Sequence, residues 1–238
     1  MIIGPGITIT GGVYVDSQVT ILPSGVYTLE LGTKAPTLGA GAQSPFPASG
    51  WSTIISTSGD DANTNVSLPF TWTYNNTGYT NFFPNSNYYV TFGSGSNQFN
   101  FLTASSPALN KIYFAGADNS WQRVSSFTSG TDYKRLRWEG TSSTTGTPGN
   151  PNMVYELTFF NPSLTDGNPW IELLVGVQAR GNNNVGVISG LYNQTTKLAD
   201  LGPSNRGVTA NQSYVMVGNS TGTSWTVYTG YKVGGTGY

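Results

Sequence analysis

The side chains that most often carry out chemistry in proteins are scarce in this chain. Its 238 residues include no Cys and no His, and only 9% of them are charged. Imidazole and thiolate groups supply many nucleophiles, many of the acids and bases that work near neutral pH, and the softer metal ligands. The chemistry that remains open is that of the 11 Asp and Glu carboxylates and of the aromatic rings, which make up 13% of the chain.

Two carboxylates facing each other across a cleft would make a glycosidase site. Glu139, Glu156 and Glu172 lie on segments that we expect to be strands. The alternation of side chains along a strand places Glu156 and Glu172 at positions that we expect to face outward into solvent. We therefore predict that the chain is not an enzyme and has no catalytic residues.

Oxygen-rich turns are the second candidate for chemistry. Asp60 and Asp61, with Asn63 and Asn65 close by, offer oxygen ligands of the kind that Ca²⁺ prefers. No Glu stands at the twelfth place that an EF-hand loop requires, and local side-chain-to-backbone bonds account for such a turn equally well. We predict no metal and no cofactor, with a weak calcium site near Asp60 and Asp61 as the alternative.

Aromatic residues gather in two places, one between Tyr79 and Tyr89 and the other between Trp225 and Tyr238. Exposed rings stack on sugars or on a protein partner, whereas alternation along a strand buries about half of them in a core. Core packing is the favoured interpretation for the first group. For the second group, core packing and partner binding are almost equally favoured. We predict partner contacts for four residues of the second group and three near the N-terminus: Trp225, Tyr228, Tyr231, Tyr238, Ile7, Ile9 and Tyr27.

The segments that carry these candidate side chains are predicted to be strands. In the segment 66–74, Val66, Leu68, Phe70, Trp72 and Tyr74 alternate with mostly polar residues, so they share one face. No segment shows a helical apolar period, which indicates an all-β chain. We predict an antiparallel β-sandwich over residues 51–200, with strands at 51–55, 66–74, 81–84, 88–92, 111–115, 133–138, 153–160 and 170–177.

The two ends differ from this core. Residues 1–50 are predicted to be an extended N-terminal arm and linker, with strand-like alternation at 7–10 and 27–31. The Gly/Pro/Ala-rich stretch 34–50 is typical of a linker or of a clamped, extended strap. Residues 201–238 carry two predicted strands, 213–217 and 224–228, which form a C-terminal hairpin that completes or flanks the sandwich.

Charge and hydropathy exclude two kinds of partner. The net charge is −1, and the basic residues are scattered apart from Lys134, Arg135 and Arg137. Nucleic-acid binding relies on a basic footprint, so we predict none. No run of 18 apolar residues occurs, and the N-terminus lacks the basic region and apolar block of a signal peptide, so we predict no membrane insertion.

Three segments of the predicted core occur in a characteristic order: residues 68–74 (LPFTWTY), residues 86–93 (SNYYVTFG) and the Trp138-Glu139 pair. In this order they resemble nidogen-like β-sandwich modules, so we expect the sandwich to be of jelly-roll or nidogen-like type. Later matches are 155–160, 170–173 and 186–190, so that the resemblance covers roughly residues 60–195. It departs at Tyr88, where the family usually has Gly, and at 117–119. The resemblance implies a fold and says little about function.

The N-terminus resembles the openings of virion proteins of tailed bacteriophages, through the segment 4–12 (GPGITITGG). That resemblance implies a structural protein located in the virion, most simply a capsid decoration or head-fibre protein. Its partners would be capsid or other virion proteins, and it would form a homo-oligomer. The alternative is a tail-fibre or adhesin-type module whose aromatic residues bind host-surface glycans.

Overall fold

The computed structural model describes the core of the chain and part of its ends. The described residues are 2–3, 20–21, 37–40, 50–56, 61–98, 108–116, 123–140, 153–178, 188–194, 196–201 and 208–234. The chain divides into two compact units, Met1–Lys34 and Ala35–Tyr238. In the first unit, β1 (Ile2–Ile3) pairs in parallel with β2 (Thr20–Ile21). The predicted strands at 7–10 and 27–31 lie outside the described residues.

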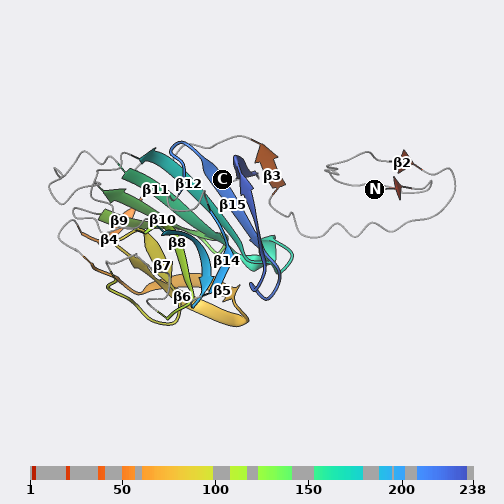
Figure 1. Ribbon diagram of the computed structural model, residues 1–238. Coiled ribbons are helices and arrows are strands. Elements are labelled where there is room, and N and C mark those ends of the chain that lie inside the picture. The colour runs from red at the N-terminus through yellow and green to blue at the C-terminus, as the bar shows by residue number, and fades with distance from the viewer. Residues whose placement is uncertain are drawn as a thin grey trace. The chain divides into compact units, whose positions relative to one another are not determined.

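The second unit confirms the predicted all-β sandwich. Two sheets with antiparallel strands pack face to face around one core, as Figure 1 shows. The seven-stranded sheet runs in the order β16 (Trp225–Thr229), β15 (Ser213–Gly218), β12 (Trp170–Gln178), β11 (Met153–Phe160), β10 (Tyr133–Gly140), β9 (Arg123–Ser129) and β4 (Ser52–Ile55). The six-stranded sheet runs in the order β14 (Thr196–Ala199), β13 (Ile188–Asn193), β8 (Lys111–Gly116), β7 (Tyr89–Thr91), β6 (Thr77–Asn85) and β5 (Val66–Tyr74).

Two smaller pieces accompany the sheets. β3 (Thr37–Ala40), within the stretch interpreted as a linker or strap, pairs antiparallel with β17 (Tyr231–Gly234). We call this pair the terminal ribbon. One turn of 3₁₀-helix, Pro162–Leu164, precedes β12 and is capped by the Asn161 side chain, which accepts a hydrogen bond from Ser163 N. It is the only helical turn within the described residues.

β5 and β6 form a hairpin whose geometry follows from the sequence. The alternating apolar side chains of β5 point into the core, with Phe70 half-buried and the other four buried. Asn75 and Asn76 connect the strands with φ values of 49° and 61°. Two consecutive left-handed residues make the tight turn that matches the twist of a hairpin, and Asn tolerates this conformation well.

Aromatic rings fill the space between the sheets. Trp72 is fully buried, and its ring centroid lies 5.0 Å from that of Phe159, on the opposite sheet, in an edge-to-face arrangement. Phe92 and Trp225 contact the same indole at 5.6 and 5.8 Å. Each buried aromatic side chain removes about 150–250 Å² from water, so this cluster contributes strongly to holding the two sheets together.

Candidate functional site

The candidate carboxylates lie on the outer face of the seven-stranded sheet. Glu156 on β11 stands directly opposite Arg137 on β10, and its Oε1 lies 3.2 Å from Arg137 Nη1. Arg137 Nε also lies 3.4 Å from Glu139 Oε1, and Glu139 accepts a hydrogen bond from Arg123 Nε on β9 at 2.9 Å. Opposite charges on adjacent strands attract each other. These four side chains therefore form an ion-pair ladder across β9, β10 and β11.

The prediction that Glu156 and Glu172 face solvent is wrong. Their exposed fractions are 0% and 2%. Glu172 Oε1 accepts a hydrogen bond from Val233 N at 2.8 Å, and Val233 on β17 packs with Tyr133, Phe160 and Val215. Alternation tells which face of a sheet a residue occupies, but it cannot tell whether another segment covers that face. Both carboxylates are engaged in bonds that hold strands in place.

The basic run on β10 is also structural. Arg135 is buried, donates from Nε to Thr158 Oγ1 at 2.8 Å, and lies 4.9 Å from the ring centroid of Tyr133. Lys134 donates from Nζ to Thr128 Oγ1 at 2.7 Å, and burial lowers the pKa of its ammonium group. Cations stacked on rings and bonded to neighbouring hydroxyls stabilise the sheet.

A second cluster lies on the six-stranded sheet. Tyr89, Tyr113 and Tyr192 occupy the neighbouring strands β7, β8 and β13, with ring centroids 5.2 and 5.7 Å apart in that order. The Lys111 ammonium lies 5.6 Å from the centroid of Tyr113. Burial lowers the pKa of Lys111 to about 8 and raises the pKa of Tyr89 to about 12, because a desolvated site disfavours the charged form of either group. We call these four residues the tyrosine–lysine cluster.

The segment Ser94–Gln98 is bonded to this cluster. The Tyr89 hydroxyl donates to Ser96 O at 3.0 Å and accepts from Gln98 N at 3.1 Å. The Tyr113 hydroxyl donates to Gln98 Oε1 at 3.4 Å, and Asn85 Nδ2 donates to Ser96 O at 2.6 Å. The tyrosine hydroxyls thus fix a loop through satisfied hydrogen bonds.

The predicted alternative of a calcium site falls partly within this region. Asp61 Oδ1 accepts a hydrogen bond from Asn87 Nδ2 at 2.7 Å, whereas Asp60 lies outside the described residues. Among the residues that the structure describes, no three Asp or Glu side chains gather in a way that would hold a metal ion. Asp61 therefore has a structural partner in this chain.

Protein-family models, curated proteins and solved structures offer no match to this chain. The resemblances to nidogen-like modules and to phage virion proteins rest on the sequence motifs. Tyr88, where the sequence departs from the nidogen-like pattern, has a φ of 59°. Within the described ranges, no helix is long and apolar enough to span a membrane.

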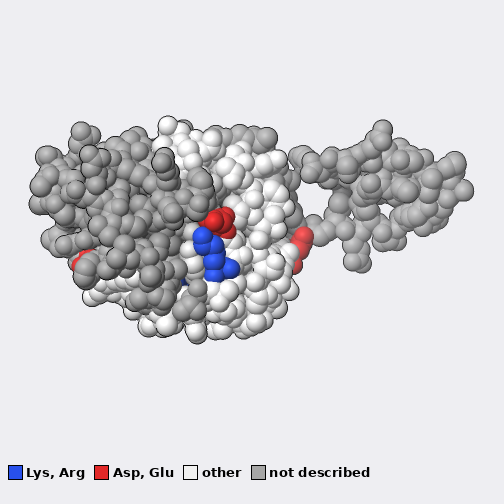
Figure 2. All heavy atoms as spheres, viewed as in Figure 1, with Lys and Arg blue, Asp and Glu red and all other residues white. Residues whose placement is uncertain are grey.

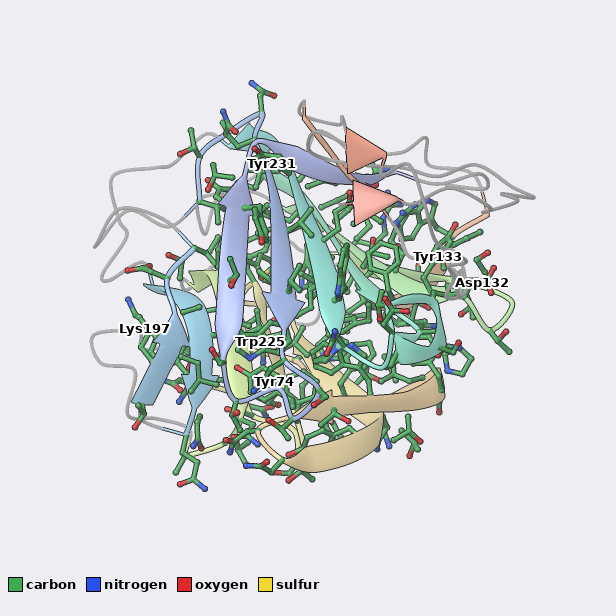
Figure 3. The ribbon with its side chains drawn as sticks, turned by 90° about the vertical axis from the view of Figure 1, so that its right-hand side faces the viewer. Tyr74, Asp132, Tyr133, Lys197, Trp225 and Tyr231 are labelled. Carbon is green, nitrogen blue, oxygen red and sulfur yellow. The ribbon has the colours of Figure 1, made fainter. Side chains whose placement is uncertain are left out.

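The residues predicted to contact partners occupy different environments. Trp225 is only 8% exposed, with its ring 5.6 Å from Tyr74, and its Nε1 donates to Gly222 O at 2.9 Å, so it belongs to the core. Tyr228 is half-buried, and Tyr231 is 38% exposed, with the two ring centroids 5.7 Å apart. In Figure 3, Tyr231 lies beyond one end of β16, whereas Trp225 and Tyr74 lie near its other end. The other four lie outside the described residues: Ile7, Ile9, Tyr27 and Tyr238.

Tyr88 and Tyr89 are adjacent buried tyrosines whose hydroxyl groups have opposite environments. The Tyr88 ring lies in the main core, 5.0 Å from Tyr155, and its hydroxyl has no hydrogen-bond partner. We expect Tyr88→Phe to raise the free energy of unfolding by about 1 kcal/mol, because it removes a buried hydroxyl without a partner. We expect Tyr89→Phe to lower it by about 1–2 kcal/mol, because it removes the bonds to Ser96 and Gln98.

Urea unfolding followed by tryptophan fluorescence measures both changes in the same assay. The two substitutions are chemically identical and differ in the bonds that the hydroxyl makes. A destabilising Tyr88→Phe, or a neutral Tyr89→Phe, would contradict this assignment of the two hydroxyls.

Proposed function

We propose that this chain is a non-enzymatic structural component of a tailed-phage virion, a capsid decoration or head-fibre protein that acts through protein–protein contacts. Its partners are capsid or other virion proteins and further copies of itself. The N-terminal segment 4–12, which resembles virion-protein openings, is the sequence support for the phage setting.

The placement of charge is the structural observation that favours this role. Arg135, Glu156 and Glu172 are buried in bonds between strands. On the face that Figure 2 shows, the charged atoms of the described residues form small groups, and most of the other described atoms belong to uncharged residues. An interface built on such a surface relies on contact area and hydrogen bonds more than on charge.

The composition of the particle tests the proposal. Quantitative mass spectrometry of density-purified virions of the phage that encodes this chain should find it at a fixed ratio to the major capsid protein. Hundreds of copies would identify a shell component, and a handful would identify a fibre or tail part. Its presence in the infected lysate together with its absence from the purified particles would overturn the proposal.

Deletion of the N-terminal unit provides a second test of the proposal. We expect deletion of residues 1–34 to abolish co-sedimentation with particles that lack the protein, while the melting temperature of the remaining unit stays the same. That boundary separates the two compact units and leaves every strand of both large sheets in place. Unchanged binding by the truncated chain would show that this unit makes no contact with the particle.

A glycan-binding module is the second candidate. Tyr231 is the only large apolar side chain that is exposed among the described residues, and it lies against Tyr228. Exposed tyrosines stack on pyranose rings. Binding of the purified chain to host lipopolysaccharide, weakened at least tenfold by Tyr231→Ala, would support this candidate over a shell role.

A further inference from the structure

The terminal ribbon joins distant parts of the chain outside both large sheets. Its register pairs Tyr231 with Ala40, Lys232 with Gly39, Val233 with Leu38 and Gly234 with Thr37. Neither strand of the ribbon belongs to the seven-stranded or the six-stranded sheet. Main-chain hydrogen bonds of this kind fix the register of a strand but do not depend on which copy of the chain supplies it.

The two strands of the ribbon are held very differently. β17 follows β16 after the single residue Gly230 and is anchored by buried Val233, whose N–H bonds to Glu172. β3 has β17 as its main neighbour among the described elements. β17 is therefore anchored in the sandwich, whereas β3 is held mainly through its pairing with β17.

The connection between β3 and β4 is long enough for a different pairing. Residues 41–51 separate the two strands and include Pro45 and Pro47. Extended, this segment spans roughly 35 Å, about twice the radius of gyration expected of a unit of this size. The length of this segment therefore allows β3 to reach an adjacent copy.

We propose that β3 is exchanged between copies, so that in the assembled protein β3 of one copy pairs with β17 of a second copy. This inference rests on the proposed function, since it supplies the contact through which copies associate. Exchange preserves every contact within the ribbon, so it costs little once copies are held close together. A dilute chain pairs its own β3 with its own β17.

The absence of cysteine from the natural chain permits a direct test. In the variant Gly39→Cys/Lys232→Cys the two new thiols stand on directly paired residues, where cross-strand Cα distances suit a disulfide. Concentrated protein is separated into assembled and monomeric fractions, oxidised, and run on a non-reducing gel. We expect covalent dimers or larger species in the assembled fraction and cross-links within one chain in the monomeric fraction.

A matched control uses a pair inside one hairpin. Val217→Cys/Thr226→Cys joins paired residues of β15 and β16 and should cross-link within one chain in both fractions. Ala40→Cys/Tyr231→Cys samples another pair of the ribbon and guards against a local folding defect in the first variant. Cross-links confined to single chains in the assembled fraction, or a chain that stays monomeric at every concentration, would overturn strand exchange. The particle composition decides the proposed function separately.

Discussion

Gly222→Ala is expected to lower the free energy of unfolding by about 3 kcal/mol. Gly222 has a φ of +63°, and a Cβ there would lie 2.7 Å from Thr73 O and 2.8 Å from Tyr74 Cα. Those neighbours are backbone atoms, so the clash cannot be relieved by moving a flexible side chain. Left-handed backbone costs a non-glycine residue about 1 kcal/mol, and overpacking adds about 1–3 kcal/mol.

The size of this effect comes from a contact between the two sheets. Asn75 N donates to Gly222 O at 3.0 Å and Asn76 N donates to Thr221 O at 2.7 Å, so the turn of the β5–β6 hairpin is bonded to the β15–β16 loop. Gly222 O also accepts the indole N–H of Trp225. A Cβ at Gly222 pushes these bonds apart and loosens one end of the sandwich.

Gly130→Ala is the matched control. Gly130 also lies in a turn with positive φ, +49°, but nothing stands within 4 Å of the place that a Cβ would occupy. We expect Gly130→Ala to lower the free energy of unfolding by about 1 kcal/mol, which is the cost of the left-handed backbone without any overpacking. Urea unfolding of both variants separates the two contributions, and equal effects would mean that the close approach at Gly222 does not limit stability.

The strands that the sequence predicts best are those with regular alternation or dense apolar content. β5 and β11 match the predicted segments 66–74 and 153–160 at both ends. β9 is absent from the predicted strands, because its sequence RVSSFTS has few apolar residues. Its place between β10 and β4 comes from backbone pairing with its neighbours, which a single sequence does not reveal. The same holds for β14, a short strand with no buried residue.

Whether a candidate residue is exposed depends on whether another segment covers its face of the sheet. The alternation of side chains along a strand does not reveal this. Tyr88 and Tyr89 are consecutive, so one of them has to leave the core face, yet both are fully buried. Tyr89 is buried in the tyrosine–lysine cluster, with its hydroxyl bonded to Ser96 and Gln98. The prediction for Glu156 and Glu172 is wrong for the same reason. The sequence shows only an acid on one predicted strand and a basic run on another; the register that places Glu156 opposite Arg137 comes from the structure and explains the cross-strand ion pair.

Trp225→Ala is expected to lower the free energy of unfolding by about 3–5 kcal/mol, the range for removing a buried tryptophan. The Trp225 ring lies 5.8 Å from Trp72 and 5.6 Å from Tyr74, both of which are fully buried. Its removal leaves a cavity between β16 and β5 and deletes the bond to Gly222. Urea unfolding of the purified variant measures the loss.

Tyr231→Ala is the control that separates core from contact surface. Tyr231 is 38% exposed, so we expect its truncation to change the free energy of unfolding by less than about 1 kcal/mol. If the C-terminal aromatics contact a partner, Tyr231→Ala weakens association of the folded protein, whereas Trp225→Ala weakens association only as far as it unfolds the chain. A Trp225→Ala variant that keeps its stability but fails to associate would instead place Trp225 at the interface. The two residues lie close together in the sequence, and only the packing against Trp72 and Tyr74 assigns them opposite roles.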